Sequence, residues 1–150
     1  LRSEGLVLLT DDGDLASVLT HPRYEHTKEY RVHVEGRPTE ETLNKWRAGV
    51  FLDGARTAPA EVTIIEREPK HTWLRVVLHE GRKRQIRRIG AMLGHPVRRL
   101  IRVRIGPIQL GNLRPGEWRH LRDGEIKQLM EIKEQKQPRH AGRTQHLYRH

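Results

Sequence analysis

The chain has 150 residues, a formal net charge of +10 and 32% charged residues. Its length suffices for one domain with a hydrophobic core, and the lack of cysteine excludes disulfides, a thiol nucleophile and a cysteine-based zinc site. No apolar run approaches the roughly 20 residues that span a bilayer, no signal peptide is visible, and the ten histidines show no metal-like spacing. We therefore expect a soluble cytoplasmic protein.

The first part of the chain predicts two strands. Residues 5–10 form a continuous apolar run, which indicates a buried strand. Residues 27–36 place Tyr30, Val32 and Val34 on one side and polar residues on the other, which predicts a strand with Tyr30 facing inwards. Because a buried phenol must place its hydroxyl, Tyr30 is either plain core or a candidate site residue.

A helix and a hairpin follow. Thr39 is a good N-cap for a helix with Trp46 on its apolar side. Residues 59–67 and 72–79 read as two strands, and the residues between them favour a hairpin.

The stretch from Gly81 to Gly116 carries the chain's excess charge. It contains ten lysines and arginines and no acidic residue, while the other 19 basic residues are balanced by all 19 acidic ones. Such a local positive field predicts an anionic partner.

This basic stretch begins with a predicted helix that Gly94 ends. Its apolar stripe, at helical spacing, consists of Ile86, Ile89 and Leu93. Three arginines fall away from the stripe, namely Arg84, Arg87 and Arg88. Arg82 lies on the apolar side, where a guanidinium needs a carboxylate or a phosphate. The spacing is equally compatible with an Arg82 that caps a loop or pairs with Glu80.

A strand follows the helix in the predicted order. Residues 97–105 place apolar side chains on one side and Arg98, Arg102 and Arg104 on the other. A solvated charged face usually mixes signs, so an arginine-only face favours contact with phosphate. Short strands near residues 108–110 and 118–121 and a helix capped by Asp123 complete the ordered part.

These elements predict an α+β fold with a mixed, largely antiparallel sheet and helices packed on one side. We expect the domain to span residues 1–135. Residues 136–150 are basic and are expected to form a disordered tail.

Three segments resemble, in the right order, motifs of the bacterial ribosomal RNA pseudouridine synthases of the RsuA-like class. They are SEGLVLLTDDGDLA (residues 3–16), TKEYRVHVEG (27–36) and LHEGRKRQIRRIGAMLGHPVRRLIRVRIGPIQLGNLRPGEWRHL (78–121). The resemblance covers about residues 1–125 and implies a pseudouridine-synthase-like catalytic domain. The family's catalytic aspartate would stand immediately before Leu1, so we expect a domain truncated at its N-terminus.

The resemblance implies isomerisation of a specific uridine in ribosomal RNA, more narrowly of the large subunit, by a reaction that needs neither metal nor cofactor. The sequence gives no evidence of oligomerisation, so a monomer is the default expectation. It implies that Tyr30 packs on the flipped base and takes part in removing its C5 proton, that Arg82 pairs with the aspartate, and that Ile86 lies near the base. Five residues are candidates for RNA contact: Lys28, Lys83, Arg84, Arg87 and Arg88.

Two alternatives remain open. The basic stretch is equally compatible with a non-catalytic module that binds ribosomal RNA, and less so with a DNA-binding strand–helix module. Tyr30 and Arg82, each within its motif, favour the enzyme. The residue before Leu1 in the parent gene distinguishes them, since the enzyme requires an aspartate there.

Overall fold

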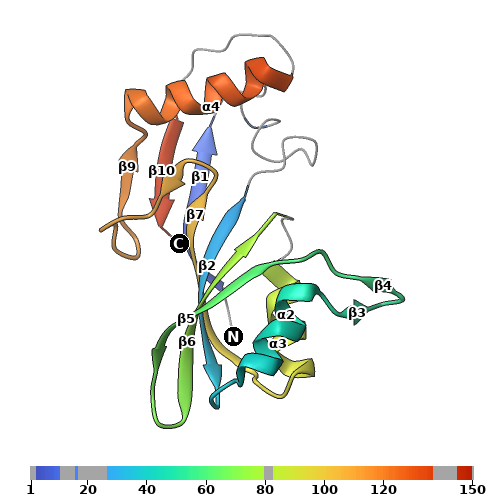
Figure 1. Ribbon diagram of the computed structural model, residues 1–150. Coiled ribbons are helices and arrows are strands. Elements are labelled where there is room, and N and C mark those ends of the chain that lie inside the picture. The colour runs from blue at the N-terminus through green and yellow to red at the C-terminus, as the bar shows by residue number, and fades with distance from the viewer. Residues whose placement is uncertain (1–2, 11–15, 17–26, 80–82, 137–144, 150) are drawn as a thin grey trace.

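The computed structural model describes residues 3–10, 16, 27–79, 83–136 and 145–149 (Figure 1). The main sheet contains β1 (Ser3–Thr10), β2 (Lys28–Glu35), β5 (Glu61–Arg67), β6 (His71–Leu78), β7 (Val97–Ile105), β8 (Ile108–Gln109), β9 (Trp118–His120) and β10 (Gln145–Arg149). The remaining elements are a ribbon of β3 (Phe51–Leu52) and β4 (Ala55–Arg56), and the helices α2 (Glu40–Ala48), α3 (Lys83–Met92) and α4 (Asp123–Lys136).

The main sheet has the order β5-β6-β2-β7-β1-β10-β9, with β8 beside β7. Its described strand pairs are antiparallel except for β1 with β7, which is parallel. The predicted α+β class with a mixed, largely antiparallel sheet is therefore confirmed. The expected hairpin is also present, as β5 and β6.

Two cores lie on opposite faces of β7, as its consecutive residues Leu100 and Ile101 indicate. The α3-side core consists of Tyr30, Val32, Val34, Leu43, Trp46, Val62, Leu74, Val76, Leu78, Ile86, Ile89, Val97 and Leu100. The α4-side core consists of Leu6, Ile101, Ile105, Ile108, Leu110, Leu121, Leu129 and Leu147. The helices α2 and α3 share one face of the sheet, as predicted. The helix α4 packs into the α4-side core instead, because the end of the sheet that contains β1, β9 and β10 has an apolar face of its own.

Local sequence explains why α2 and α3, the two helices of the α3-side core, form where they do. Thr39 caps α2, because its Oγ1 accepts a hydrogen bond from the Thr42 N–H at 3.2 Å. In α3, Ile86 and Ile89 are 0% and 4% exposed, which confirms the predicted apolar stripe.

The C-terminal segment differs from its prediction as a disordered tail. Residues 145–149 form β10, which pairs with both β1 and β9. Leu147 is fully buried in the α4-side core. The strand depends on two partners distant in sequence, so its polar, basic composition does not reveal it.

Among the described residues, no helix combines the length and the apolar character that crossing a membrane requires.

Candidate active site

Three segments that carry the sequence motifs meet at the middle of β7. Tyr30 of β2 lies opposite Arg102, and Gly5 near the start of β1 pairs with the same residue from the other side. Ile86 of α3 packs in the same core as Leu100 of β7. The motif segments are therefore neighbours although they lie far apart in the sequence.

The close approach of β1 to β7 requires a glycine. Gly5 has a φ of 109°, and a Cβ added there would lie 2.2 Å from the carbonyl oxygen of Arg102. Any other residue would clash with β7 and strain the backbone. The start of β1 therefore lies directly against β7, at the residue of β7 that pairs with Tyr30 of β2.

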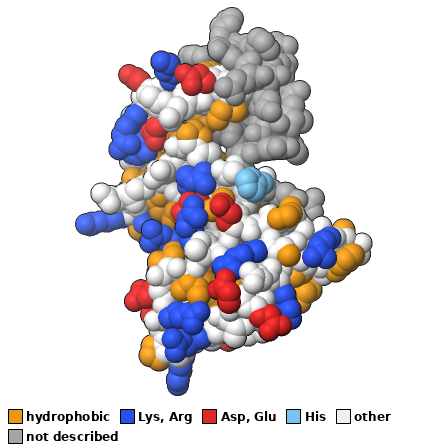
Figure 2. All heavy atoms as spheres, viewed as in Figure 1, with side chains coloured by type: hydrophobic (Ala, Val, Ile, Leu, Met, Phe, Trp, Pro, Cys, Tyr) orange, Lys and Arg blue, Asp and Glu red, His pale blue; other side chains and the backbone are white. Residues whose placement is uncertain are grey.

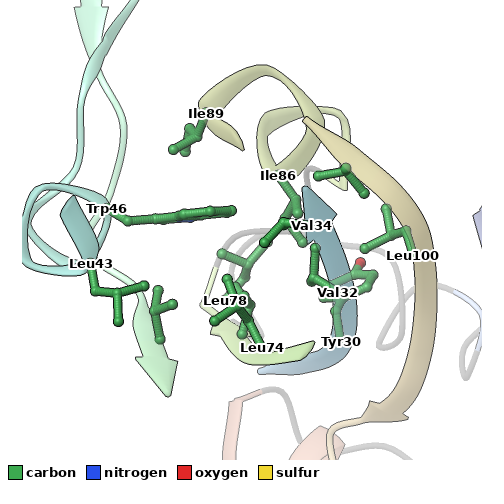
Figure 3. Close-up of a cluster of buried hydrophobic side chains, with 13 residues drawn as sticks. Tyr30, Val32, Val34, Leu43, Trp46, Leu74, Leu78, Ile86, Ile89 and Leu100 are labelled. Carbon is green, nitrogen blue, oxygen red and sulfur yellow. The ribbon is translucent and has the colours of Figure 1, made fainter. Parts of the chain in front are cut away.

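Tyr30 is buried, with 1% of its surface exposed. Figure 3 shows its ring in one cluster with Ile86, the two coming from β2 and α3. Its hydroxyl is buried, and no described group meets the geometry of a hydrogen bond to it, although the Arg102 guanidinium lies close enough to interact with it. Leaving such a group unsatisfied costs about 1–3 kcal/mol, so core packing alone does not account for a phenol in preference to a phenyl ring at this position.

Arg102 places a positive charge beside this phenol. Its Nε and Nη2 both donate to the carbonyl oxygen of Leu6, at 3.0 and 2.6 Å, which fixes the guanidinium between β7 and β1. Burial raises the pKa of Tyr30, whereas the charge of Arg102 and its hydrogen-bonding interaction with the phenol lower the pKa by less, so the net direction is upward. Tyr30 is therefore a neutral phenol at physiological pH, able to stack or to donate a hydrogen bond.

The basic face of α3 adjoins this region. Arg84 and Arg88 are exposed and Arg87 is half-buried. Arg88 forms a bidentate pair with Asp53, with Nη1–Oδ2 and Nη2–Oδ1 distances of 2.5 and 2.9 Å. The Nη2 of Arg87 is buried and has no hydrogen-bond partner within the described part of the chain. Arg84 of this helix therefore presents an exposed guanidinium that an anion can reach.

Comparison with known proteins identifies the class of this arrangement. Residues 2–92 match the family described as RNA pseudouridylate synthase. The chain is 44% identical over 128 residues to an uncharacterized RNA pseudouridine synthase of Aquifex aeolicus, covering 85% of this chain and 51% of that protein. It is 45% identical over 132 residues to the ribosomal large subunit pseudouridine synthase E of Xanthomonas campestris, covering 78% and 71%.

A crystal structure of a pseudouridylate synthase superimposes with a TM-score of 0.77 at 34% identity, covering 85% of this chain and 55% of that one. The chain belongs to the RNA pseudouridylate synthase family. The resemblance to the RsuA-like class is thereby confirmed. The chain spans about half the length of several of the relatives that it matches.

Two of the residues predicted for a pseudouridine synthase site lie wholly or partly outside the described part of the chain. Arg82 is not among the described residues, so its pairing with an aspartate stays a prediction. Lys83 is the first residue of α3, but its side chain is not among the described ones. Lys28 is half-buried at the start of β2, where it pairs with Leu78 and Ile105.

The β7 arginines bind acceptors within the protein, including Arg102 and Arg104, which were expected to face phosphate. Arg99 pairs with Glu4 through Nε and Nη2, at 2.8 and 2.9 Å. Arg104 donates from Nη1 to Thr27 Oγ1 and to the carbonyl oxygen of Gly106, at 2.8 and 2.9 Å. On the face seen in Figure 2, basic and acidic side chains lie interspersed. These arginines connect β7 to neighbouring segments because their acceptors lie on strands and loops beside it.

The role of Arg102 in particular is missed by sequence reasoning. Alternation along residues 97–105 placed it with two other arginines on a presumed phosphate-facing side. Its neighbours Leu6 and Tyr30 come from strands 96 and 72 residues earlier in the chain. Only the pairing of β7 with both β1 and β2 brings these groups together.

One group of side chains could in principle hold a metal ion. Donor atoms of His33, Glu68 and His71 lie within 4.8 Å of one another, although the sequence shows no metal-like spacing. His33 Nε2 lies 2.6 Å from Glu68 Oε1, and Arg98 Nη1 lies 2.6 Å from His71 Nε2. A metal ion there would face the fixed charge of Arg98. Hydrogen bonding among these residues explains the cluster without a metal.

Proposed function

We propose that this protein isomerises uridine to pseudouridine in ribosomal RNA, and more narrowly in RNA of the large ribosomal subunit. Membership of the RNA pseudouridylate synthase family supports the reaction. Support for the substrate comes from relatives in Xanthomonas and Vibrio that are named ribosomal large subunit pseudouridine synthase E.

The observation that carries the proposal is the buried Tyr30 hydroxyl, which forms no well-aligned hydrogen bond within the described residues and lies beside the Arg102 guanidinium. It lies where the start of β1, the middle of β7 and α3 converge. A phenol that only filled the core would be better replaced by phenylalanine, because its hydroxyl finds no well-aligned hydrogen bond among the described residues. A uracil base brings both a ring to stack on and polar edges to accept a hydrogen bond.

The proposed reaction redistributes bonds within one nucleotide. The C1′–N1 bond breaks, the base turns, and a C1′–C5 bond forms. C5 gives up its proton and N1 gains one, so product and substrate are isomers and no oxidant or reductant is required. The target base must leave its stack, which costs a few kcal/mol. Contacts from the basic α3 face to flanking phosphates offset this cost.

Four side chains have separate roles in the proposed reaction. Arg82 holds the aspartate that is expected before Leu1, and Ile86 packs near the base. Tyr30 is neutral in the free protein because its pKa is raised, so it first packs on the base as a phenol. Removal of the C5 proton by Tyr30 requires its phenolate form, which the positive charge of Arg102 favours.

Tritium release tests the reaction. Large-subunit ribosomal RNA is transcribed with 5-tritiated uridine and incubated with the natural full-length protein, and tritium leaves when C5 loses its hydrogen. We expect release by the wild type and little or none by Arg82→Ala, with RNA binding preserved. The matched control is Arg67→Ala, which removes an exposed arginine from β5. Full activity of Arg82→Ala would refute the role assigned to Arg82.

The alternative function is a module that binds ribosomal RNA without chemistry. The many cationic side chains of α3 and its surroundings support binding of any RNA. This alternative predicts that the wild type binds the transcript but releases no tritium. It also predicts a residue other than aspartate before Leu1 in the parent gene.

A further inference from the structure

The β3–β4 ribbon extends away from the sheet (Figure 1). It is a two-stranded antiparallel element in which Phe51 pairs with Arg56 and Leu52 pairs with Ala55. Phe51 is 63% exposed, which makes it the most exposed of the large hydrophobic side chains in the described part of the chain. Exposure of a phenyl ring to water is unfavourable, so a partner that covers the ring would gain free energy of binding.

The two faces of the ribbon differ. Adjacent residues of a strand point to opposite sides. Leu52 is half-buried and packs against the α3-side core, whereas Phe51 and Arg56 are both exposed. Side chains that are paired across two strands project from the same face. The outer face therefore presents an aromatic ring and a guanidinium next to each other.

The ribbon is also held in a defined position. Its base is closed by two hydrogen bonds, from the Val50 N–H to Thr57 Oγ1 at 2.9 Å and from the Thr57 N–H to the Val50 carbonyl at 2.8 Å. The turn residues Asp53 and Gly54 have φ values of 53° and 78°, as in a tight two-residue hairpin turn. The carboxylate of Asp53 then accepts both hydrogen bonds from Arg88 of α3. The outer face is thus oriented relative to the basic helix.

These features fit a single-stranded nucleic acid. Unpaired bases stack on aromatic side chains while cationic side chains contact the backbone. Arg56 is exposed opposite Phe51 on the ribbon, and Arg84 and Arg88 are exposed on α3, the helix that Asp53 of the ribbon contacts. Because the backbone of the ribbon is held in place, only the Phe51 side chain has to be ordered on binding, which strengthens the contact.

We propose that the β3–β4 ribbon is an RNA-binding element of the enzyme, in which Phe51 stacks on an unpaired base near the target uridine and Arg56 contacts a phosphate. The Asp53–Arg88 pair positions the ribbon against α3. This inference rests on the proposed function. It adds a second contact to the substrate, away from the buried Tyr30.

Substitution of Phe51 in the natural full-length protein tests the stacking. The RNA is the large-subunit transcript with 5-tritiated uridine. Phe51→Ala is expected to weaken binding and raise KM on the order of tenfold, with kcat unchanged at saturating RNA, and Phe51→Trp to retain affinity. The matched control is Trp118→Ala, which removes an aromatic side chain of 59% exposure at the far end of the sheet, on β9. It is expected to leave KM unchanged.

Substitution of Asp53 tests the positioning. Asp53→Asn keeps a residue that tolerates a φ of 53° but removes the charge that holds Arg88. The change makes the protein more positive, so electrostatics alone would strengthen RNA binding. The proposal predicts weaker binding, by a few-fold, because the ribbon is no longer held.

Each outcome decides between the proposal and its alternatives. Unchanged KM in Phe51→Ala, with normal tritium release by the wild type, would overturn the ribbon proposal and leave the proposed function standing. No release by the wild type would overturn the function itself. A defect that appears on ribosomal assembly particles but not on protein-free RNA would assign the Phe51 surface to a protein partner and would also refute the stacking.

Discussion

Two arginine-rich segments, α3 and β7, are similar in sequence but differ in what their arginines contact. The β7 arginines bind acceptors within the protein: Arg99 binds Glu4, Arg102 binds the Leu6 carbonyl, and Arg104 binds Thr27. In α3, Arg84 is exposed, Arg87 has a buried nitrogen without a described partner, and Arg88 binds the β3–β4 ribbon. A high density of arginines therefore indicates an anion-binding surface only where neighbouring elements supply few acceptors.

The difference follows from position in the fold. β7 lies between β1 and β2, so Arg99, Arg102 and Arg104 reach acceptors on neighbouring segments, while Arg98 contacts His71 of β6. The polar face of a surface helix points to solvent, and α3 has such a face. We infer that β7 arginines mainly contribute to stability and the assembly of the site, and α3 arginines to RNA affinity.

The largest effect is expected at Arg102. Arg102→Met leaves the Leu6 carbonyl without its two hydrogen bonds and removes the cation beside Tyr30. We expect a loss of about 1–3 kcal/mol in the free energy of unfolding and a fall in kcat. Urea unfolding measures the free energy change, and tritium release measures kcat. If stability and kcat were both unchanged, Arg102 would behave like an exposed surface arginine. The distinction between the arginines of β7 and those of α3 would then be wrong.

The next effect is expected on α3. Arg84→Gln should weaken RNA binding and reduce the slope of log affinity against log salt by about 0.7–0.9 for each phosphate that the protein no longer neutralises. Its free energy of unfolding should stay within about 0.5 kcal/mol of the wild type. Binding titrations at several salt concentrations measure the slope. An unaltered slope would remove Arg84 from the RNA-binding surface.

A smaller effect is expected at Arg99. Its pair with Glu4 is partly exposed, with side-chain exposures of 47% and 33%, so Arg99→Gln should cost at most about 1 kcal/mol. The hydrogen bond from Arg99 lowers the pKa of Glu4 below its usual 4.5. The stabilisation is therefore present above pH 4.5 and is lost as the pH falls through the lowered pKa. The free energy of unfolding, measured as a function of pH, should show this loss of stability in the wild type but not in Arg99→Gln. The salt dependence of RNA binding should be the same in both proteins.

The smallest effect concerns the alkaline pH dependence of stability. The pKa of Tyr30 is raised above its usual value of 10.0, so the folded protein holds this proton more tightly than the unfolded chain. The contribution is complete below pH 10 and is lost as the pH rises through the higher folded-state pKa. Tyr30→Phe should lack this loss. In Arg102→Met the pKa of Tyr30 should rise further, which the ultraviolet absorbance of tyrosinate can measure.

Local sequence patterns predicted much of the fold but not the partners of its side chains. Alternation in residues 27–36 and helical spacing from Ile86 to Leu93 are strong signals, and both elements are present. β10 gave no such signal because it depends on pairing with β1 and β9. The partners of the β7 arginines were equally inaccessible, since Glu4 and Arg99 are separated by 95 residues.

The candidate site was predicted only in part. Tyr30 and Ile86 were identified through motif resemblance, and the fold brings both into one core. Arg102 was assigned to a phosphate-facing side because its contact with β1 depends on a parallel pairing that alternation does not reveal. The Phe51 ribbon was missed because a two-residue strand is too short for a periodic pattern.

The central claim is that the buried Tyr30 hydroxyl serves uridine isomerisation and not folding. The most direct test is to incubate large-subunit ribosomal RNA with wild-type protein or Tyr30→Phe, digest it to nucleosides and quantify pseudouridine by chromatography. Because the hydroxyl forms no well-aligned hydrogen bond within the described residues, Tyr30→Phe should fold as stably as the wild type and bind RNA, yet form little or no pseudouridine. Equal pseudouridine from both proteins, or none from the wild type, would contradict the account.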